Sequence, residues 1–335
     1  MNFSQSVYLS GVGCSVPDKV LTNHDLSKMV DTSDHWIKTR SGISKRRIAS
    51  PNQTTGDMGA EAGRQAIENA GLKPKDIDLI IVATITPDTP FPATACWIQK
   101  KLELGTIPAF DISAACSGFI YLLDIGKHLL RSGNYKNVLI IGAEKMSSII
   151  DWQDRTTCVL FGDGAGAAVL SKCNQTNTGI IDTLLGADGN NAKLLYQPNG
   201  GSLTPLTHET FSQRKHFLQM NGREVFKHAV KVMEKAATSI LSRNHIEPQN
   251  LKYIIPHQAN LRIIENLSQR LDVPLNLFYN NLDKYGNTSA ASIPLALSEC
   301  YHEKNLKTGD LILMIAFGGG LTWAASIIKW NKDYE

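Results

Sequence analysis

The stretch "PAFDISAACSGFIYLLDIGKHLLRSG", residues 108–133, decides how this chain folds. Residues 109–112 have strand character, small side chains follow, and the apolar spacing predicts a long helix over 117–131. A single cysteine, Cys116, stands between the two elements. A strand that leads directly into a helix is typical of α/β proteins, whose sites lie at such strand ends. The stretch therefore predicts an α/β fold with a thiol at a strand-to-helix junction.

The order of strands and helices is repeated along the chain. Residues 70–84, AGLKPKDIDLIIVAT, match residues 244–258, NHIEPQNLKYIIPHQ, at an offset of 174. Each copy is a polar turn that leads from a predicted helix into an apolar strand. The repeat predicts two similar halves, 1–173 and 174–335, with parallel sheets that are covered on both faces.

The repeat also predicts where chemically useful side chains meet. Cys116 and Ser289 stand at the same distance before two equivalent strands, and Asn287 lies two residues before Ser289. His257 directly follows another apolar strand. If the halves pack around a pseudo-twofold axis, these strand ends meet near the centre of the protein. We therefore expect Cys116, His257 and Asn287 to share one site.

Composition limits the class of protein. The chain has 335 residues, of which 42% are hydrophobic and 19% charged, so we expect a soluble globular protein. The net charge of +3 is too small to favour nucleic acid as a partner. No apolar run reaches the length of a membrane span, and no export signal precedes the first strand. Six scattered cysteines without a CxxC pair predict reduced thiols in the cytoplasm and no metal site.

Cys116 has both a structural and a chemical interpretation. A free cysteine is often a small buried hydrophobe. At the start of the helix over 117–131, however, unpaired backbone N–H groups stabilise a thiolate, so we expect a lowered thiol pKa. Ala114, Ala115 and Gly118 leave room for an acyl group to approach.

His257 and Asn287 likewise have ordinary explanations. Most histidines are structural, and an asparagine beside Gly286 is typical of a turn. A Cys, His and Asn set also serves papain-like proteases, but the local protease signature is absent and the repeat does not suit that fold.

Two glycine clusters have the composition of binding loops. "FGDGAGAAVL", residues 161–170, has the spacing of a dinucleotide loop, but a strand rather than a helix follows it, so we interpret it as a tight turn between strands. "AFGGGLTW", residues 316–323, follows an apolar strand and could bring a backbone N–H close to a reacting carbonyl.

Together these motifs resemble the β-ketoacyl-acyl carrier protein synthase III family over essentially the whole chain. The blocks occur in family order: "MVDTSDHWIKTRSGI", "FPATAC", "AACSGF", "FGDGAGAAVL", "MNGREVFK", "PHQANLRII", "YGNTSAAS" and "AFGGGLTW". The resemblance implies a thiolase-like fold of five layers, αβαβα, in a homodimer. It implies a decarboxylating Claisen condensation of an acyl-CoA primer with malonyl-acyl carrier protein, which starts fatty acid synthesis. Coenzyme A enters as a thioester substrate, without a metal or other cofactor.

The resemblance also implies roles for single residues. Cys116 matches the nucleophile, His257 and Asn287 match the pair that assists decarboxylation, and the amides of Cys116 and Gly319 match the oxyanion hole. Phe91 matches a residue that crosses the dimer interface and closes the pocket for short primers, which favours acetyl-CoA. The matches for coenzyme A contacts are Trp36, Arg40, Arg155, Gly222, Phe226, Ala259 and Asn260. The matches for carrier-protein docking are Lys227, Arg262 and Arg270.

Alternatives remain open at this point. A relative from secondary metabolism would keep the same three residues with a different primer. A non-catalytic partner subunit typically lacks the nucleophilic cysteine, which this chain retains at residue 116. A hydroxymethylglutaryl-CoA synthase-like or thiolase-like condensation would need a glutamate base, for which Glu144 is the candidate, or a second cysteine.

Overall fold

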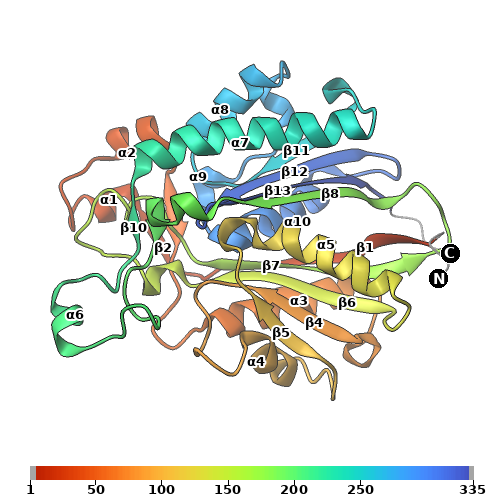
Figure 1. Cartoon of the computed structure of the whole chain (residues 1–335), viewed down its shortest axis with the longest axis horizontal. Helices are drawn as coiled ribbons and strands as arrows, with labels where there is room; N and C mark the ends of the chain where they lie inside the picture. The colour runs from red at the N-terminus through yellow and green to blue at the C-terminus, as the bar shows by residue number, and fades with distance from the viewer. Residues whose placement is uncertain (1–4, 332–335) are drawn as a thin grey trace.

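The computed structural model describes residues 5–331, whose two large β-sheets are stacked between layers of helices, beside two small sheets of two strands each (Figure 1). The first sheet has five strands in the order β1-β7-β6-β4-β5. Its strands are β1 (Ser6–Ser15), β4 (Leu79–Ala83), β5 (Ala109–Ile112), β6 (Asn137–Glu144) and β7 (Gly164–Cys173). The second sheet has four strands in the order β11-β12-β13-β8. Its strands are β8 (Gly179–Ala187), β11 (Tyr253–Pro256), β12 (Leu311–Gly318) and β13 (Thr322–Lys329).

Helices fill three layers around these sheets, as the resemblance predicts. The outer layer on the first sheet holds α3 (Thr55–Asn69) and α4 (Thr94–Lys101). The central layer, between the sheets, holds α5 (Gly118–Arg131) and α10 (Ser292–Lys304). The outer layer on the second sheet holds α7 (Gly222–Arg243) and α8 (Leu261–Arg270). The order αβαβα is visible from bottom to top in Figure 1, so the five-layer α/β prediction is confirmed.

Apolar packing explains this layering. The largest core cluster lies around α5, where Phe119, Leu122 and Leu123 are buried against both sheets. The strand β4 is apolar along its whole length, and β6 is apolar between its polar end residues Asn137 and Glu144, because helices cover both faces of these strands.

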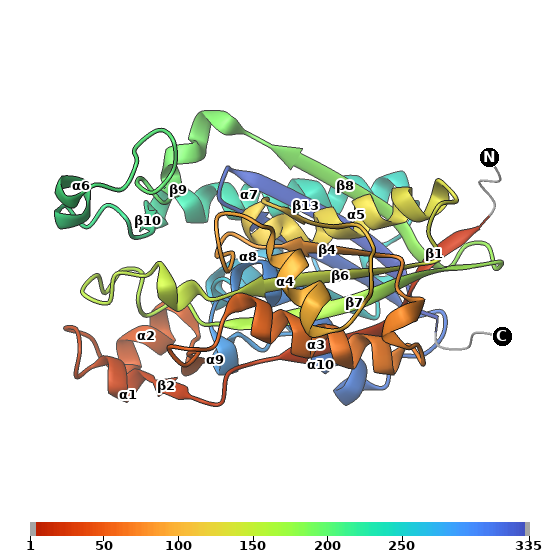
Figure 2. The same ribbon diagram turned by 90° about the horizontal axis from the view of Figure 1, so that it is seen from below.

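The remaining elements lie at the end of the molecule where the site is found. They are β2 (Val20–Thr22), α1 (Asn23–Leu26), α2 (Asp34–Ser41), β3 (Lys45–Arg47), β9 (Leu195–Tyr196), α6 (His208–Ser212), β10 (Gln219–Met220) and α9 (Leu282–Tyr285). Figure 2 shows α6, β9 and β10 projecting at the end opposite the start of β1.

The two sheets are mixed, which corrects the expectation of parallel sheets. Only β4 with β5, β4 with β6, and β11 with β12 pair in parallel. The other ladders of the two sheets are antiparallel. In the second sheet this follows from the short connection 319–321, which turns β12 back into β13 and leaves no room for a crossover helix.

The repeat is present in three dimensions, shifted by one residue from the predicted pairing. The 3₁₀ turns that precede α5 and α10 begin at Ala115 and Ser289, which both have a positive φ, 46° and 49°. Since 289 − 115 = 174, Ala115 and Ser289 are equivalent. The counterpart of Cys116 is therefore Ala290, and the pairing of Cys116 with Ser289 is wrong by one residue. Low identity between the halves had hidden the register.

Each sheet is built from one part of the chain. The strands of the first sheet lie within residues 6–173, and those of the second within 179–329. The division into halves 1–173 and 174–335 stays a prediction, which this distribution supports. Among the described residues, no helix is both long and apolar enough to cross a bilayer.

Candidate active site

Cys116 lies in the 3₁₀ turn Ala115–Ser117, between β5 and α5, as the sequence predicts. The end of β12 packs against its backbone. A Cβ atom at Gly318 would lie 2.6 Å from the Cys116 nitrogen, so only glycine permits this approach. Gly318, the last residue of β12 and the first of the glycine cluster, thus contacts the candidate nucleophile, and Gly319 follows it directly.

His257 directly follows β11, and its backbone is hydrogen-bonded to the neighbouring strand, β12. Its backbone N–H donates to the Ile315 carbonyl of β12, at 2.8 Å. The ring is buried, and burial lowers the pKa of His257 to about 3. The imidazole is therefore neutral, with one N–H donor and one acceptor. Nδ1 has no hydrogen-bond partner within residues 5–331.

Asn287 is held by the motif that was interpreted as a tight turn between strands. Its N–H donates to the Leu160 carbonyl at 2.9 Å, and its carbonyl accepts from the Gly162 N–H at 3.0 Å. The motif contains no turn between two strands, because a loop precedes Gly164, where β7 begins. The Asn287 Oδ1 accepts from the Ser289 N–H at 2.9 Å, which leaves the Nδ2 amide as the donor for a ligand.

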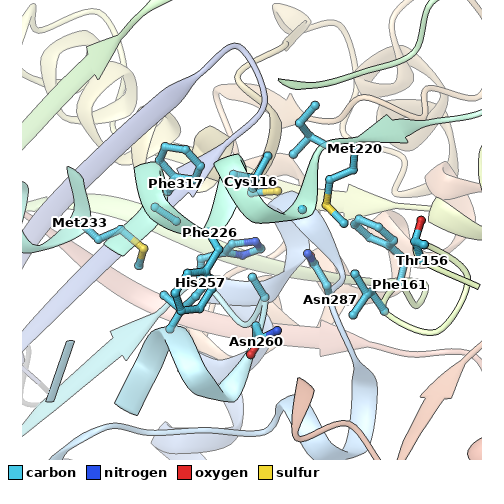
Figure 3. Close-up of a pocket in the computed structure, with 17 residues that line it drawn as sticks. Cys116, Thr156, Phe161, Met220, Phe226, Met233, His257, Asn260, Asn287 and Phe317 are labelled. Atoms are coloured by element: carbon cyan, nitrogen blue, oxygen red, sulfur yellow. The ribbon is translucent and has the colours of Figure 1, made fainter. Parts of the chain in front are cut away.

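One cavity brings the three side chains together. Cys116, His257 and Asn287 all line a cavity of about 230 Å³, to which both halves of the chain contribute (Figure 3). Residues matched to the pantetheine channel line it as well, namely Gly222, Phe226, Ala259 and Asn260. The cavity can therefore hold a thioester with its carbonyl between a thiol and two neutral donors.

A second cavity, of about 300 Å³, lies on the other side of Cys116. Phe161, Leu195 and Cys116 line both cavities, so the thiol stands where the two meet. The apolar residues that line the second cavity include Ile85, Met146, Ile149 and Leu218. Gly319 and Ser289 also face it. An acyl group bound to the sulfur could occupy this space.

The thiol pKa moves in the opposite direction from the prediction. Burial raises the pKa of Cys116 to about 12, and the negative charge of Glu144 raises it further. A hydrogen bond to Ser289 lowers it, without reversing the effect of burial. Desolvation penalises the thiolate in the buried pocket, and this effect outweighs the stabilisation expected from the helix end. The resting group is therefore a thiol, and its proton must leave when the sulfur attacks.

The predicted nucleotide contacts line neither cavity, but Arg155 precedes Thr156 and Arg40 is hydrogen-bonded to Asn260, and both of these neighbours line the first cavity. The Arg155 guanidinium lies over the Trp36 ring, 5.6 Å from its centre, and bonds to the Asp31 carboxylate at 3.1 Å. The exposed Arg40 in α2 is joined to the site, since its carbonyl accepts from Asn260 Nδ2 at 3.1 Å. A planar base could stack on Trp36 only if Arg155 moved from the ring face.

The three predicted docking cations are exposed on α7 and α8, which pack together. Lys227 pairs with Glu224 at 2.8 Å, and Arg270 pairs with Glu234 at 2.6 Å. Arg262 has no acidic partner within the described part of the chain.

Phe91 lies apart from the site. Its side chain is 85% exposed, and it lines neither cavity beside Cys116. Residues 5–331 contain no group of three or more His, Cys, Asp or Glu side chains arranged to hold a metal ion.

Several site residues were missed by reasoning from sequence. Phe161 and Leu195 line both cavities, and Met220 and Met233 line the first. Phe161 belongs to the quoted glycine motif, which was a usable signal. Met220 opens the quoted block MNGREVFK, whereas Leu195 and Met233 come from segments without a distinctive pattern, and only the packing of the halves brings them near the thiol.

Comparison with known proteins shows the family to which this chain is similar. Models of 3-oxoacyl-[acyl-carrier-protein (ACP)] synthase III match residues 110–189, and models of its C-terminal part match 241–330. A β-ketoacyl-[acyl-carrier-protein] synthase III of Caldanaerobacter subterraneus subsp. tengcongensis is 55% identical over 322 residues, 96% of this chain and 97% of the relative.

Two solved structures are also similar. The crystal structure of 3-oxoacyl-[acyl-carrier-protein] synthase III from Aquifex aeolicus VF5 has a TM-score of 0.89 and 47% identity, and the match covers 97% of this chain and 100% of that one. The priming β-ketosynthase of the R1128 polyketide biosynthetic pathway has a TM-score of 0.89 and 35% identity, over 96% and 95%. The chain belongs to the β-ketoacyl-acyl carrier protein synthase III family, the condensing acyltransferases of type II fatty acid synthesis.

Proposed function

We propose that Cys116, His257 and Asn287 carry out the condensation that defines the family. The observation that carries this proposal is that a thiol, a neutral imidazole and a carboxamide from the two halves line one cavity. These are the groups needed to hold an acyl chain and to stabilise a negatively charged oxygen. Retention of the cysteine also argues against a non-catalytic partner subunit.

In the first half-reaction the Cys116 sulfur attacks the thioester carbonyl of an acyl-CoA. The carbonyl oxygen becomes negatively charged as the S–C bond forms. The amides of Cys116 and Gly319 are the proposed donors to that oxygen. Their hydrogen bonds would stabilise a transition state that water alone stabilises poorly. Coenzyme A then leaves, and the acyl group extends from the sulfur into the second cavity.

In the second half-reaction malonyl on the carrier protein enters the first cavity. Loss of CO₂ leaves an enolate whose oxygen needs hydrogen-bond donors. The neutral His257, protonated at Nε2, and the Asn287 amide Nδ2 supply them. The enolate carbon attacks the acyl carbon on Cys116, and a β-ketoacyl thioester forms. The decarboxylation itself creates the carbanion, so the proposed route uses side chains and backbone amides alone.

The approach to the thiol suits a long, thin substrate arm. Gly222, Phe226, Ala259 and Asn260 are the proposed pantetheine contacts, since they line the cavity that ends at Cys116. Trp36 with Arg155 is the proposed adenine site, and Arg40 is the proposed phosphate contact. For this, Arg155 would move from the Trp36 ring face onto the other side of the base.

The acidic carrier protein would dock on the cations of α7 and α8. Arg262, Lys227 and Arg270 are the proposed contacts, and the unpaired state of Arg262 among the described residues supports its part in this surface. We also propose a homodimer, which would cover the exposed Phe91, and a cytoplasmic location, with which the six free cysteines agree.

The primer is proposed to be acetyl-CoA. This choice depends on the partner subunit's Phe91 closing the second cavity, because about 300 Å³ exceeds what an acetyl group fills. The likeness to the R1128 priming β-ketosynthase favours a second candidate, a synthase of secondary metabolism with a different primer. Acyl-CoAs of two to eight carbons, supplied in competition, separate the two candidates by the mass of the adduct.

Covalent labelling tests the residue roles. Radiolabelled acetyl-CoA should label the wild type and the control Cys300→Ala, whose cysteine is buried in α10, and should leave Cys116→Ala unlabelled. His257→Ala and Asn287→Ala should be labelled normally and yet form no β-ketoacyl product. Undiminished labelling of Cys116→Ala would refute the nucleophile, and equal loss of both steps would make His257 and Asn287 structural.

A further inference from the structure

A carboxylate without a cation is buried next to the active site. Glu144, the last residue of β6, is 0% exposed. It accepts hydrogen bonds from the hydroxyls of Thr84 at 3.2 Å and Thr86 at 2.5 Å, and from the Ile85 N–H at 3.1 Å. A fourth comes from the Ser289 hydroxyl at 3.0 Å. Among residues 5–331, Glu144 forms no ion pair, so four neutral donors hold a group that can ionise.

Ser289 connects this carboxylate to the nucleophile. The Cys116 thiol donates to the Ser289 Oγ, at an S···O distance of 3.6 Å, and the same hydroxyl donates to the Glu144 Oε1. Ser289 holds a positive φ of 49°, and its N–H donates to the Asn287 Oδ1. A continuous chain of donors and acceptors therefore runs from the sulfur to a buried carboxylate, beside the proposed enolate donor.

The resting thiol makes such a chain useful. Cys116 is protonated in the closed pocket, so attack on a thioester requires an acceptor for its proton. Burial raises the pKa of Glu144 to about 7, which suits a group that takes up and returns a proton near neutral pH. Buried His257, with its pKa lowered, is a much weaker acceptor.

We propose that Ser289 and Glu144 hold the proton of Cys116 for as long as the sulfur carries the acyl group. During acylation the thiol proton moves to the Ser289 Oγ, and the Ser289 hydroxyl proton moves to the Glu144 Oε1. The sulfur–acyl bond forms, the acyl–CoA bond breaks, and coenzyme A leaves as a thiolate that takes a proton from water.

Condensation reverses the transfer. The enolate carbon bonds to the acyl carbon, the sulfur–acyl bond breaks, and Glu144 returns the proton through Ser289 to the sulfur. One proton is taken from water per turnover, by coenzyme A, and no oxidant or reductant is needed. Glu144 acts through Ser289 and is a positioning residue in this scheme, whereas Ser289 contacts the reacting sulfur. The scheme rests on Cys116 being the acyl acceptor.

The groups that face Glu144 limit other sources of a pH effect. Cys116 is the titratable group on the far side of Ser289, and β7 presents Gly164 opposite Glu144. Residues 84–86 contribute only hydroxyls and an amide. The neighbouring Lys145 directs its ammonium away, to the carbonyls of residues 50, 51 and 53.

The first test follows single-turnover acetylation of Cys116 by acetyl-CoA, measured by intact-protein mass between pH 5.5 and 9. The wild-type rate should rise with a midpoint near pH 7, the pKa of Glu144. Glu144→Gln should lose this rise and acetylate about a hundredfold more slowly at pH 7.5, the low end of what a positioned proton acceptor contributes. The matched control is Asp163→Asn, a buried carboxylate held by Ser147 and by the Ala49 N–H, with no contact to Cys116.

Asp163→Asn should keep the wild-type midpoint. Folded Glu144→Gln with an unchanged midpoint and a rate within twofold of the wild type would overturn the proposal. Alkylation of Cys116 by iodoacetamide, followed by mass of the peptide, reports the thiol itself. Since the Glu144 charge raises the Cys116 pKa, Glu144→Gln should be alkylated at lower pH while it acetylates more slowly. A parallel loss of both rates would indicate disruption of the site and would also overturn it.

The second test separates the Ser289 hydroxyl from its backbone strain. Ser289→Ala and Ser289→Gly both remove the hydroxyl, and glycine also relieves the positive φ. Both should acetylate at least tenfold more slowly than the wild type, in line with a lost proton carrier. A wild-type rate in Ser289→Gly would show that the hydroxyl carries no proton. Labelling of Cys116→Ala would refute the nucleophile instead, so the two failures are distinguishable.

Discussion

Gly162→Ala tests how strictly the backbone around Asn287 must be held. Gly162 donates to the Asn287 carbonyl at 3.0 Å, and a Cβ atom on it would lie 2.3 Å from the Tyr285 carbonyl oxygen. Real Cβ contacts do not fall below 3.0 Å, so the two backbones must separate by at least 3.0 − 2.3 = 0.7 Å. A misplacement of about 1 Å costs a catalytic site about a hundredfold in rate.

We therefore expect condensation by Gly162→Ala to fall about a hundredfold, because the Asn287 amide moves away from the enolate oxygen. Acetylation of Cys116, which does not need Asn287, should change less than threefold. The assay follows both steps, adduct mass for the first and CO₂ release from malonyl-acyl carrier protein for the second. Gly189→Ala is the control, since its Cβ would meet nothing within 4 Å. Normal CO₂ release by folded Gly162→Ala would refute the reasoning.

Three further predictions concern charge and pH. Because the pKa of His257 in the folded protein lies far below 6.5, unfolding in acid is accompanied by protonation of this histidine. The contribution of neutral His257 to the free energy of unfolding is complete above pH 6.5, and about 1.4 kcal/mol of it is lost at pH 5.5. Urea titrations of the wild type and of His257→Gln should therefore give free energies of unfolding that converge as the pH falls. The pH dependence due to Glu144 has the opposite sign, because folding raises its pKa from 4.5 to about 7. Its contribution to the free energy of unfolding is fully present below pH 4.5 and falls by about 3 kcal/mol as the pH rises through 7. The free energy of unfolding of Glu144→Gln should therefore depend less steeply on pH than that of the wild type. Arg155→Ala should raise the KM for acetyl-CoA about three- to thirtyfold with kcat unchanged, since a stacked guanidinium contributes about 0.5–2 kcal/mol to binding. A lower KM would mean that Arg155 only blocks the face of the Trp36 ring.

The layered fold was predictable from the repeat, because apolar strands at a constant offset must be buried in equivalent places. The direction of the strands could not be predicted from the repeat. β13 is antiparallel to β12 because the connection 319–321 is short. The cluster of glycines in this connection does not by itself predict whether the chain crosses over the sheet or turns back. The exact register was also out of reach, since Ala115 and Ser289 are equivalent through a shared backbone conformation rather than a shared side chain.

The three candidate catalytic residues were predictable because each lies at a strand end or a helix end that the repeat places near the centre of the protein. The electrostatics of the site were not predictable in the same way. The thiol pKa depends on how deeply Cys116 is buried under β12 and the opposite half, and this burial outweighs the effect of the helix end. Phe161 belongs to a quoted motif and Glu144 was a candidate base in the sequence, but only contacts between distant segments place Phe161 in both cavities and connect Glu144 to Cys116 through Ser289.

Pseudo-symmetry explains why a serine lies beside the nucleophile. The two equivalent turns contact each other at the centre of the molecule, and each begins with a residue of positive φ. In the first turn the second position carries the thiol, Cys116, and in the other turn the first position carries a hydroxyl, Ser289. Because the turns face each other, the one-residue difference sets sulfur and hydroxyl side by side rather than far apart. If the first position of the second turn only had to relieve backbone strain, glycine would serve best there. Ala115 has the same backbone conformation at the equivalent position without being glycine, so the positive φ alone does not select the side chain, and Ser289→Gly tests whether the hydroxyl is what this position contributes.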